Sequence, residues 1–266
     1  MKILPISDIH SEIWLPKQGY WTVQFKKWFD QVDVLVIAGD NSSCINNLVL
    51  ITQVLLEFPK LEIVYVLGNH DYYMTRYNHA WESMLWADYS IDRLHVLTGY
   101  DKCAWEFQDV VFIGGTLWTD FNQMNSNAIN AVQRGLNDYR AIASNNGTKP
   151  ITANFIYNEH CTMKKNIFRL LERYPDKKRV VVTHHKPFLS EIITDPLTYG
   201  YEVDLTKELN ECTNLPEYWI YGHTHKSGWT TKSYINGDVT FISNQFGYPS
   251  EDTSVTGFHK DCILEV

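Results

Sequence analysis

Short apolar runs alternate with longer stretches of helical periodicity along most of the chain. The runs predict buried strands at Lys2–Ile6, Val34–Ala38, 62–67, 180–182 and 218–220. Apolar residues that recur every three or four positions predict helices at 22–29, 45–58, 79–87 and 155–173. Because strands that alternate with helices pair in parallel and are buried on both faces, the pattern indicates a largely parallel sheet.

Two later pairs of apolar runs differ, because a short turn alone separates the members of each pair. Ala104–Phe107 and 110–113 flank Gln108-Asp109, and 233–235 and 239–242 flank Asn236-Gly237. Such turns join antiparallel strands, so mixed sheets are expected. The predicted fold class is α/β: a layered αββα sandwich with mixed sheets and its site at the carboxyl ends of the strands. No change in composition marks a domain boundary, so residues 1–266 are predicted to form a single domain.

The composition is that of an ordinary globular chain, with 266 residues, 44% of them hydrophobic and 20% charged. The net charge of −8 leaves no broad basic surface, which disfavours extended nucleic acid as a partner. It does not exclude a small phosphate-ester substrate, because bound cations can invert the local charge of a site.

The five cysteines are scattered and never form a C-x-x-C pair. This spacing argues against a disulfide framework and a structural zinc site, and it fits a reducing compartment. Residues 1–6 lack the long apolar core of a signal peptide, and no apolar run reaches membrane-spanning length. The protein is therefore predicted to be cytoplasmic with no membrane partner, while the sequence leaves its oligomeric state open.

Five polar clusters stand directly after the predicted strands. They are Asp8-Ile9-His10, Gly39-Asp40-Asn41, Gly68-Asn69-His70-Asp71, His184-His185 and Gly222-His223-Thr224-His225. Each motif alone is weak, since a lone Asp-x-His occurs by chance and Gly-Asn-His-Asp is more often a turn. Five such clusters, each at a strand end, together predict two adjacent metal ions, the usual apparatus for in-line attack on a phosphate ester.

The spacing and chemistry of these residues suggest how two ions would be shared. Asp8 and His10 are separated by one residue, so both side chains point to the same side of an extended segment. Asp40 has two carboxylate oxygens and can bridge both ions. The predicted ligands are Asp8, His10, Asp40 and His225 for one ion, and Asp40, Asn69, His184 and His223 for the other. This mixture of imidazole and carboxylate ligands suits transition metals better than calcium or magnesium alone. Manganese is the first choice, and iron, zinc, nickel or cobalt are alternatives.

In this order the clusters resemble those of the calcineurin-like metallophosphoesterases, whose pattern is D-x-H, G-D, G-N-H-[DE], a lone His and G-H-x-H. The resemblance runs from Asp8 to His225 and implies the same ligand assignment. It also implies that a hydroxide bridging the metals attacks phosphorus, and that His70 protonates the leaving oxygen or stabilises its charge. Asp71 is then expected to orient His70 and to raise the pKa of its ring.

The residues after Asp40 depart from the better-known branches of that family. Cys44 stands where phosphoprotein phosphatases carry a phosphate-gripping Arg. Ser43 stands where purple acid phosphatases carry a Tyr ligand and double-strand-break nucleases a His. The chain is more similar to small bacterial and phage phosphoesterases, a similarity to which the segments 115–121, 136–140 and 183–187 also contribute.

The missing Arg bears on the substrate, because dianionic monoesters profit most from an added cation. We therefore predict an enzyme that favours phosphodiesters, such as cyclic or small nucleotide diesters. A phosphomonoesterase and a nuclease acting on nucleic-acid ends remain alternatives. A non-catalytic metal-binding module is disfavoured, because the ligand motifs and His70 are intact.

Three further residues are candidates for substrate binding, each with a plainer interpretation. Trp118 can stack on a base or phenyl ring, or cap the core. Arg140 can bind a phosphate oxygen, although a salt bridge with Asp138 or another carboxylate is the favoured interpretation. His185 can face the substrate or a supporting carboxylate. Apart from these three, Tyr248 is expected on the rim of the cleft.

Overall fold

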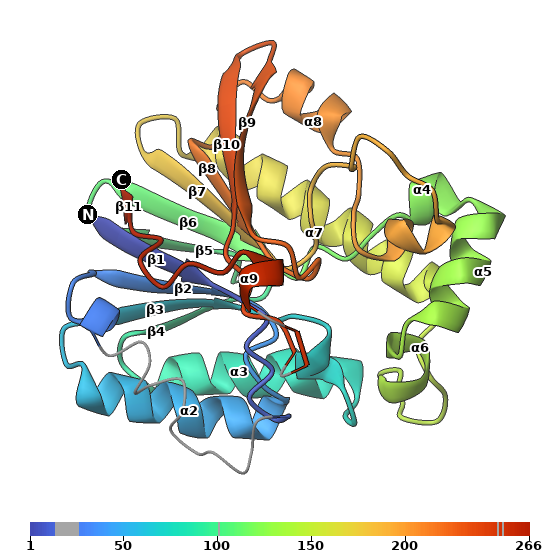
Figure 1. The fold of residues 1–266 in the computed structure, drawn as a ribbon, viewed down its shortest axis with the longest axis horizontal. Helices are drawn as coiled ribbons and strands as arrows, with labels where there is room; N and C mark the ends of the chain where they lie inside the picture. Colours follow the sequence, from blue (N-terminus) through green and yellow to red (C-terminus); the bar gives the residue numbers. More distant parts are fainter. Residues whose placement is uncertain (14–26, 101, 249, 252) are drawn as a thin grey trace.

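Two mixed sheets stack face to face, with helices on the outer side of each (Figure 1). The computed structural model describes residues 1–13, 27–100, 102–248, 250–251 and 253–266. The first sheet has the order β11-β1-β2-β3-β4 and the second has the order β5-β6-β7-β8-β10-β9. This arrangement confirms the predicted layered α/β fold class with mixed sheets.

The first sheet contains β1 (Lys2–Ile6), β2 (Val34–Ala38), β3 (Glu62–Val66), β4 (Leu94–Leu97) and β11 (Leu264–Glu265). Strands β1 to β4 are parallel, and β11 joins β1 in the antiparallel sense. The helices α2 (Cys44–Glu57) and α3 (Tyr77–Ser90) cover its outer face (Figure 1). The short strand β4 and the strand β11 were not predicted from the sequence. Most of the helix predicted at 22–29 lies outside the described residues.

The second sheet contains β5 (Ala104–Phe107), β6 (Val110–Gly115), β7 (Lys178–Thr183), β8 (Tyr218–Tyr221), β9 (Gly228–Tyr234) and β10 (Gly237–Ser243). The parallel strands β6, β7, β8 and β10 are flanked by the antiparallel strands β5 and β9. Both predicted hairpins are therefore confirmed. The outer helices are α7 (Ala153–Arg173) and α8 (Thr206–Glu211) (Figure 1).

The apolar runs are continuous because both faces of the central strands are covered. On β2, Val34 and Val36 pack between the two sheets, whereas Leu35 and Ile37 pack toward α2 and α3. Successive side chains of a strand point to opposite faces, so one strand serves both layers. Full burial of such a side chain contributes roughly 1.5–3 kcal/mol, which makes these strands the stable frame of the molecule.

Shorter elements extend the structure beside the layers (Figure 1). They are η1 (His70–Tyr72), α4 (Phe121–Met124), α5 (Ser126–Gly135), α6 (Asp138–Ala141), η2 (Pro196–Gly200) and α9 (Thr253–Thr256). None of the helices in the described part of the chain is long and apolar enough to cross a membrane.

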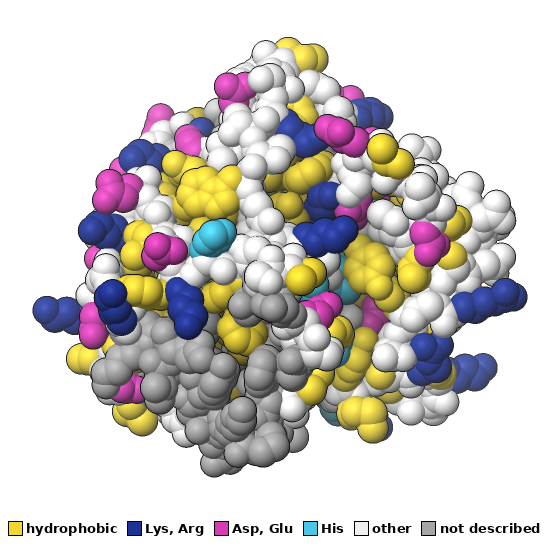
Figure 2. Space-filling view, in the orientation of Figure 1, with side chains coloured by type: hydrophobic (Ala, Val, Ile, Leu, Met, Phe, Trp, Pro, Cys, Tyr) yellow, Lys and Arg dark blue, Asp and Glu magenta, His cyan; other side chains and the backbone are white. Residues whose placement is uncertain are grey.

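The carboxyl ends of β1, β2 and β3 in the first sheet meet those of β7 and β8 in the second (Figure 1). All five polar clusters follow these strand ends. In the space-filling view, histidine atoms right of centre lie at the bottom of a hollow rather than on the outer surface (Figure 2). The fold therefore gathers the clusters into one recessed region that spans both sheets.

Candidate metal centre

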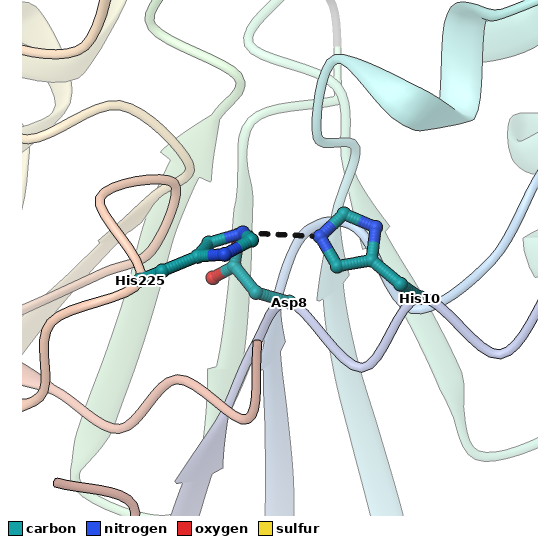
Figure 3. Close-up of side chains that lie close together, drawn as sticks. All are labelled: Asp8, His10 and His225. Atoms are coloured by element: carbon teal, nitrogen blue, oxygen red, sulfur yellow. Dashed lines mark hydrogen bonds and ion pairs between the residues drawn. The ribbon is translucent and has the colours of Figure 1, made fainter. Parts of the chain in front are cut away.

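Three candidate ligands meet where β1 and β8 end. One ligand atom from each of Asp8, His10 and His225 lies within 4.8 Å of the others (Figure 3). The Nε2 atoms of His10 and His225 are 3.1 Å apart, and Oδ1 of Asp8 is 3.5 Å from Nε2 of His225. Three of the four residues predicted for the first ion are thus brought together, and we call these three the Asp8 half of the centre.

A second group meets around His184, after β7. Its Nε2 atom lies 2.9 Å from Oδ1 of Asn69 and 3.2 Å from Nδ1 of His223. We call Asn69, His184 and His223 the Asn69 half. Asp40 stands between the halves, with Oδ2 3.4 Å from Nε2 of His184 and 3.9 Å from Nε2 of His10.

Hydrogen bonds on the far side of each ring decide which nitrogen faces the centre of the Asp8 half. Nδ1 of His10 lies 3.4 Å from Oε1 of Glu12, and Nδ1 of His225 lies 2.6 Å from Oε2 of Glu251. Carboxylates only accept, so both Nδ1 atoms carry the proton. When the rings are neutral, the two Nε2 lone pairs then face each other, an arrangement that a cation between them would stabilise.

The Asn69 half has the same arrangement with different partners. Nδ1 of His184 donates to the backbone carbonyl of Ala38 at 2.9 Å, so its Nε2 is the bare nitrogen when the ring is neutral. Nδ2 of Asn69 donates to Oδ1 of Asp138 at 2.8 Å, which turns the amide oxygen toward His184. With a neutral His184 ring, two acceptors therefore face each other at 2.9 Å. Nε2 of His223 is buried with no hydrogen-bond partner among the described residues.

The backbone turns sharply where the ligands are presented. Positive φ angles occur at five of the seven candidate ligands: Asp8, His10, Asp40, His223 and His225. This region is uncommon for residues other than glycine, and such strain concentrates at functional sites. A Cβ atom at Gly39 would clash with Nδ1 of His184, and one at Gly68 would clash with Oδ1 of Asp40. Glycine is needed there because the neighbouring cluster fills the space.

Burial and charge act against each other on the rings. Burial alone lowers the pKa of His184, but the Asp40 carboxylate outweighs it and raises the pKa to about 9. Asp8 and Glu251 likewise outweigh burial at His225 and raise its pKa to about 9. Burial and the neighbouring imidazoles hold the pKa of His223 well below its ordinary value. The carboxylates therefore draw positive charge into the centre, and metal cations can supply it.

His70 stands at the edge of the centre, where η1 begins. Its Nδ1 lies 3.1 Å from Oε1 of Glu12, and its Nε2 lies 3.2 Å from the hydroxyl of Tyr248. The ring stacks on Tyr73 with 4.2 Å between centroids. Burial alone lowers the pKa of His70, but the Asp40 and Glu12 carboxylates outweigh it and raise the pKa.

The carboxylate that contacts the His70 ring belongs to Glu12 and not to Asp71, the expected partner. Asp71 instead accepts hydrogen bonds from the Gly68 amide at 2.7 Å and the Tyr65 hydroxyl at 2.6 Å. Burial and nearby Asp40 raise the pKa of Asp71 to about 7. Asp71 thus supports the turn after β3, and Glu12 is the residue positioned to orient His70. Glu12 follows His10 by two residues, a spacing that could have identified it.

Asp138 is a second residue that the sequence interpretation placed differently. Besides Asn69, its Oδ1 accepts from the Tyr73 hydroxyl at 2.7 Å, and the residue is buried. Arg140, its expected partner, is exposed and donates to the carbonyl of Arg134 at 3.1 Å and to Oδ1 of Asn137 at 2.9 Å. The structure therefore provides no support for Arg140 as a phosphate ligand.

Trp118 and His185 lie behind the centre. Trp118 is 2% exposed and donates from Nε1 to the Tyr77 hydroxyl at 2.8 Å, within the core. Its core-capping interpretation fits this position, and stacking on a substrate does not. His185 is buried, with Nδ1 3.1 Å from the carbonyl of Thr116 and its ring 4.4 Å from that of His223. His185 therefore packs against the ring of His223, which is a candidate ligand.

A cavity of about 310 Å³ opens over the two halves. Asp40, Asn69, His70 and His223 contribute to its floor, and Tyr248, predicted at the rim, also lines it. Among the described residues that line this cavity, none is Lys or Arg. Positive charge for an anionic substrate would therefore come from bound metal ions.

Comparisons with known proteins identify the family of the chain. The family model described as calcineurin-like phosphoesterase matches residues 1–227. An uncharacterized protein (L509) of Acanthamoeba polyphaga mimivirus is 29% identical over 209 residues, which cover 71% of this chain and 69% of the relative.

Two solved structures resemble the fold over most of the chain. The phosphopantetheinyl hydrolase of Mycobacterium tuberculosis has a TM-score of 0.66 and 16% identity, covering 93% of this chain and 90% of its own. A dimetal phosphatase of Danio rerio has a TM-score of 0.53 and 15% identity, with coverages of 92% and 87%. At these identities the likeness concerns the fold.

Proposed function

The chain belongs to the calcineurin-like phosphoesterase family, and from this premise we propose that it hydrolyses phosphodiesters at a two-metal site built from its strand-end clusters. Membership makes it a metal-dependent hydrolase of phosphoric esters. The finer proposal concerns the ligands, the metal and the type of ester.

The observation that carries the ligand assignment is the set of acceptors that face one another. When the rings are neutral, the lone pairs of His10 and His225 meet at 3.1 Å, and those of His184 and Asn69 meet at 2.9 Å. A proton satisfies a single pair of atoms, whereas a metal ion satisfies a whole group. We assign Asp8, His10, Asp40 and His225 to one ion, and Asp40, Asn69, His184 and His223 to the other. Manganese is the first choice for this donor set.

When bound, two metal ions supply an activated water and positive charge against the phosphate. The chain itself positions the group that receives the leaving oxygen. Glu12 accepts the Nδ1 proton of His70, so the opposite nitrogen, Nε2, faces the cavity beside the Tyr248 hydroxyl. A protonated Nε2 there can donate to the departing oxygen. Glu12 is thus a positioning residue for His70.

The preference for diesters rests on charge. A monoester dianion gains most from a cationic side chain, and no Lys or Arg is found among the described residues of the 310 Å³ cavity. A diester carries one negative charge and needs less compensation. The two metal ions can meet that charge without help from an arginine.

Turnover of two chromogenic esters tests this proposal. With added manganese, we expect a higher kcat/KM for bis(p-nitrophenyl) phosphate than for p-nitrophenyl phosphate. Bound metal is measured by elemental analysis in the same preparations, and about two equivalents are expected. A clear preference for the monoester would refute the diester assignment, and absence of turnover by the fully loaded protein would refute the catalytic proposal.

The role of His70 has a separate test that depends on the leaving group. Nitrophenolate departs without a proton, whereas an aliphatic alkoxide needs one. His70→Gln should therefore reduce the hydrolysis of dimethyl phosphate by roughly a hundredfold or more, and that of the nitrophenyl diester much less. Equal losses on both esters would assign His70 to binding instead of proton transfer.

A further inference from the structure

A second hollow, a groove of about 710 Å³, adjoins the stacked rings of His70 and Tyr73. His70 and Tyr73 line both this groove and the metal-side cavity, so the two spaces meet at this pair of rings. Other lining residues include Glu12, Ile13, Met74 and Glu82. The groove therefore begins at the residue that the proposed function places beside the leaving oxygen.

The lining of the groove combines apolar side chains with negative charge. Ile13 is 48% exposed and Met74 is 91% exposed, although both are large and apolar. Glu12 and Glu82 are its acidic residues, and none of the described residues that line it is Lys or Arg. The apolar part of this surface suits an uncharged apolar group, and the two carboxylates disfavour an anionic one, although His70 and His79 also line the groove.

Met74 is the most informative residue of the groove. Its φ angle is 60°, a conformation that Asn and Asp adopt more readily than Met. The amide of Met74 donates to the carbonyl of Ala141 at 2.8 Å, which holds this conformation. The residue thus combines a strained backbone with an exposed apolar side chain. Contact with an apolar ligand would account for the exposed side chain, because methionine adapts its shape to varied apolar partners.

We propose that this groove binds the apolar organic part of the alcohol that leaves the phosphate. The proposal rests on the proposed function, since His70 marks the leaving-group side of the centre. It narrows the substrate class to esters of alkyl or aryl alcohols. Ile13 and Met74 supply apolar contact, and the ring of Tyr73 forms the wall next to His70.

Two diesters that share one leaving-group chemistry test this groove. Methyl 4-methylphenyl phosphate and methyl 4-butylphenyl phosphate release phenols of nearly equal pKa, but the second carries three more methylenes. We expect kcat/KM to be about tenfold higher for the butyl ester, mainly through a lower KM. Met74→Asp should bring the ratio of the two kcat/KM values close to one. Asp accepts the positive φ angle, so this variant is expected to fold.

A matched control separates the groove from general surface effects. Ile235 is 78% exposed in the turn between β9 and β10, and Ile235→Asp should leave the ratio near tenfold. Equal kcat/KM values for both esters in the wild-type protein would overturn the groove proposal. They would leave the proposed function standing, because turnover itself would have been observed.

Binding of the product phenols decides the same question without catalysis. In isothermal titration of the manganese-loaded protein, 4-butylphenol should bind about tenfold more tightly than 4-methylphenol, and Met74→Asp should remove the difference. Equal affinities in the wild-type protein would overturn the groove proposal. Failure of every ester to turn over, with the binding difference intact, would overturn the proposed function and support the groove.

Discussion

The two halves of the candidate metal centre hold their imidazoles in different ways. In the Asp8 half, carboxylates of Glu12 and Glu251 contact the outer nitrogens of His10 and His225. In the Asn69 half, the outer nitrogen of His184 donates to a backbone carbonyl. A carboxylate partner makes an imidazole a more basic ligand than a carbonyl partner does. The histidines of the Asp8 half should therefore be the stronger donors.

Charge strengthens the same contrast. The Asp8 half has a carboxylate ligand of its own and the two supporting carboxylates, whereas Asn69 contributes a neutral amide. Asp138 supports Asn69 by accepting its amide hydrogen, and burial raises the pKa of that carboxyl. Attraction for a cation falls with each negative charge that is lost. We therefore expect a tighter metal site in the Asp8 half and a weaker one in the Asn69 half, joined by Asp40.

The largest effect is expected where the halves meet. Asp40→Asn removes the carboxylate whose Oδ2 faces both His10 and His184, and whose Oδ1 accepts from the His70 amide at 2.9 Å. Metal ions contribute several kcal/mol to phosphoryl chemistry, so kcat/KM should fall by roughly a thousandfold or more. Steady-state kinetics and metal analysis check this. Asp238→Asn, at an exposed carboxylate on β10, should retain full activity and both ions.

A pair of matched variants separates the halves. His225→Ala should weaken the tighter metal equivalent by more than about a hundredfold, the upper end for loss of a supporting residue. His223→Ala should leave that equivalent in place and abolish the weaker one. Titration with manganese followed by elemental analysis distinguishes the two. Survival of the tighter equivalent in His225→Ala, with its loss in His223→Ala, would reverse the comparison.

The sequence predicted the candidate ligands of this centre better than the residues that hydrogen-bond to those ligands. The strand-end clusters could be recognised because each occupies a fixed place after an apolar run, as Asp40 does after β2. Supporting residues follow no such rule. Asp138 reaches Asn69 across 69 positions, and Glu251 reaches His225 across 26. Such contacts depend on how loops pack, which periodicity does not encode.

The expected carboxylate partner of the His70 ring also differs from the one that the structure shows. Asp71 is adjacent to His70 in the sequence, so it was the expected partner of the ring. The turn after β3 instead directs Asp71 to the Gly68 amide and the Tyr65 hydroxyl. Glu12, which lies 58 positions away, contacts the ring. Adjacent residues on a tight turn point in different directions, so sequence proximity was a poor guide.

Removing the supporting carboxylates should have a smaller effect than removing ligands. Glu251→Gln and Glu12→Gln should each weaken the tighter manganese equivalent by about 10–100-fold, because the imidazoles lose a charged partner. Asp138→Asn is the matched variant for the other half and should weaken the second equivalent alone. Calorimetric titration with manganese measures both affinities. Equal changes in both equivalents for Glu251→Gln would show that the halves do not bind independently.

The smallest effect is expected at Arg140. The proposed preference for diesters requires that the two metal ions balance the phosphate charge without a cationic side chain. The Arg140 guanidinium is exposed and donates to Arg134 and Asn137, and exposed charges contribute little. Arg140→Ala should therefore change kcat/KM for either nitrophenyl ester by less than about twofold.

Lys165→Ala, which removes an exposed cation from α7, is the control for this variant. The two variants should have the same kcat/KM within error, because neither cation contacts the cavity. A tenfold loss in Arg140→Ala, confined to the monoester, would mean that a guanidinium reaches the phosphate during turnover. The charge balance between the halves would then have to include a cation that approaches through Asn137, and the preference for diesters would lose its physical basis.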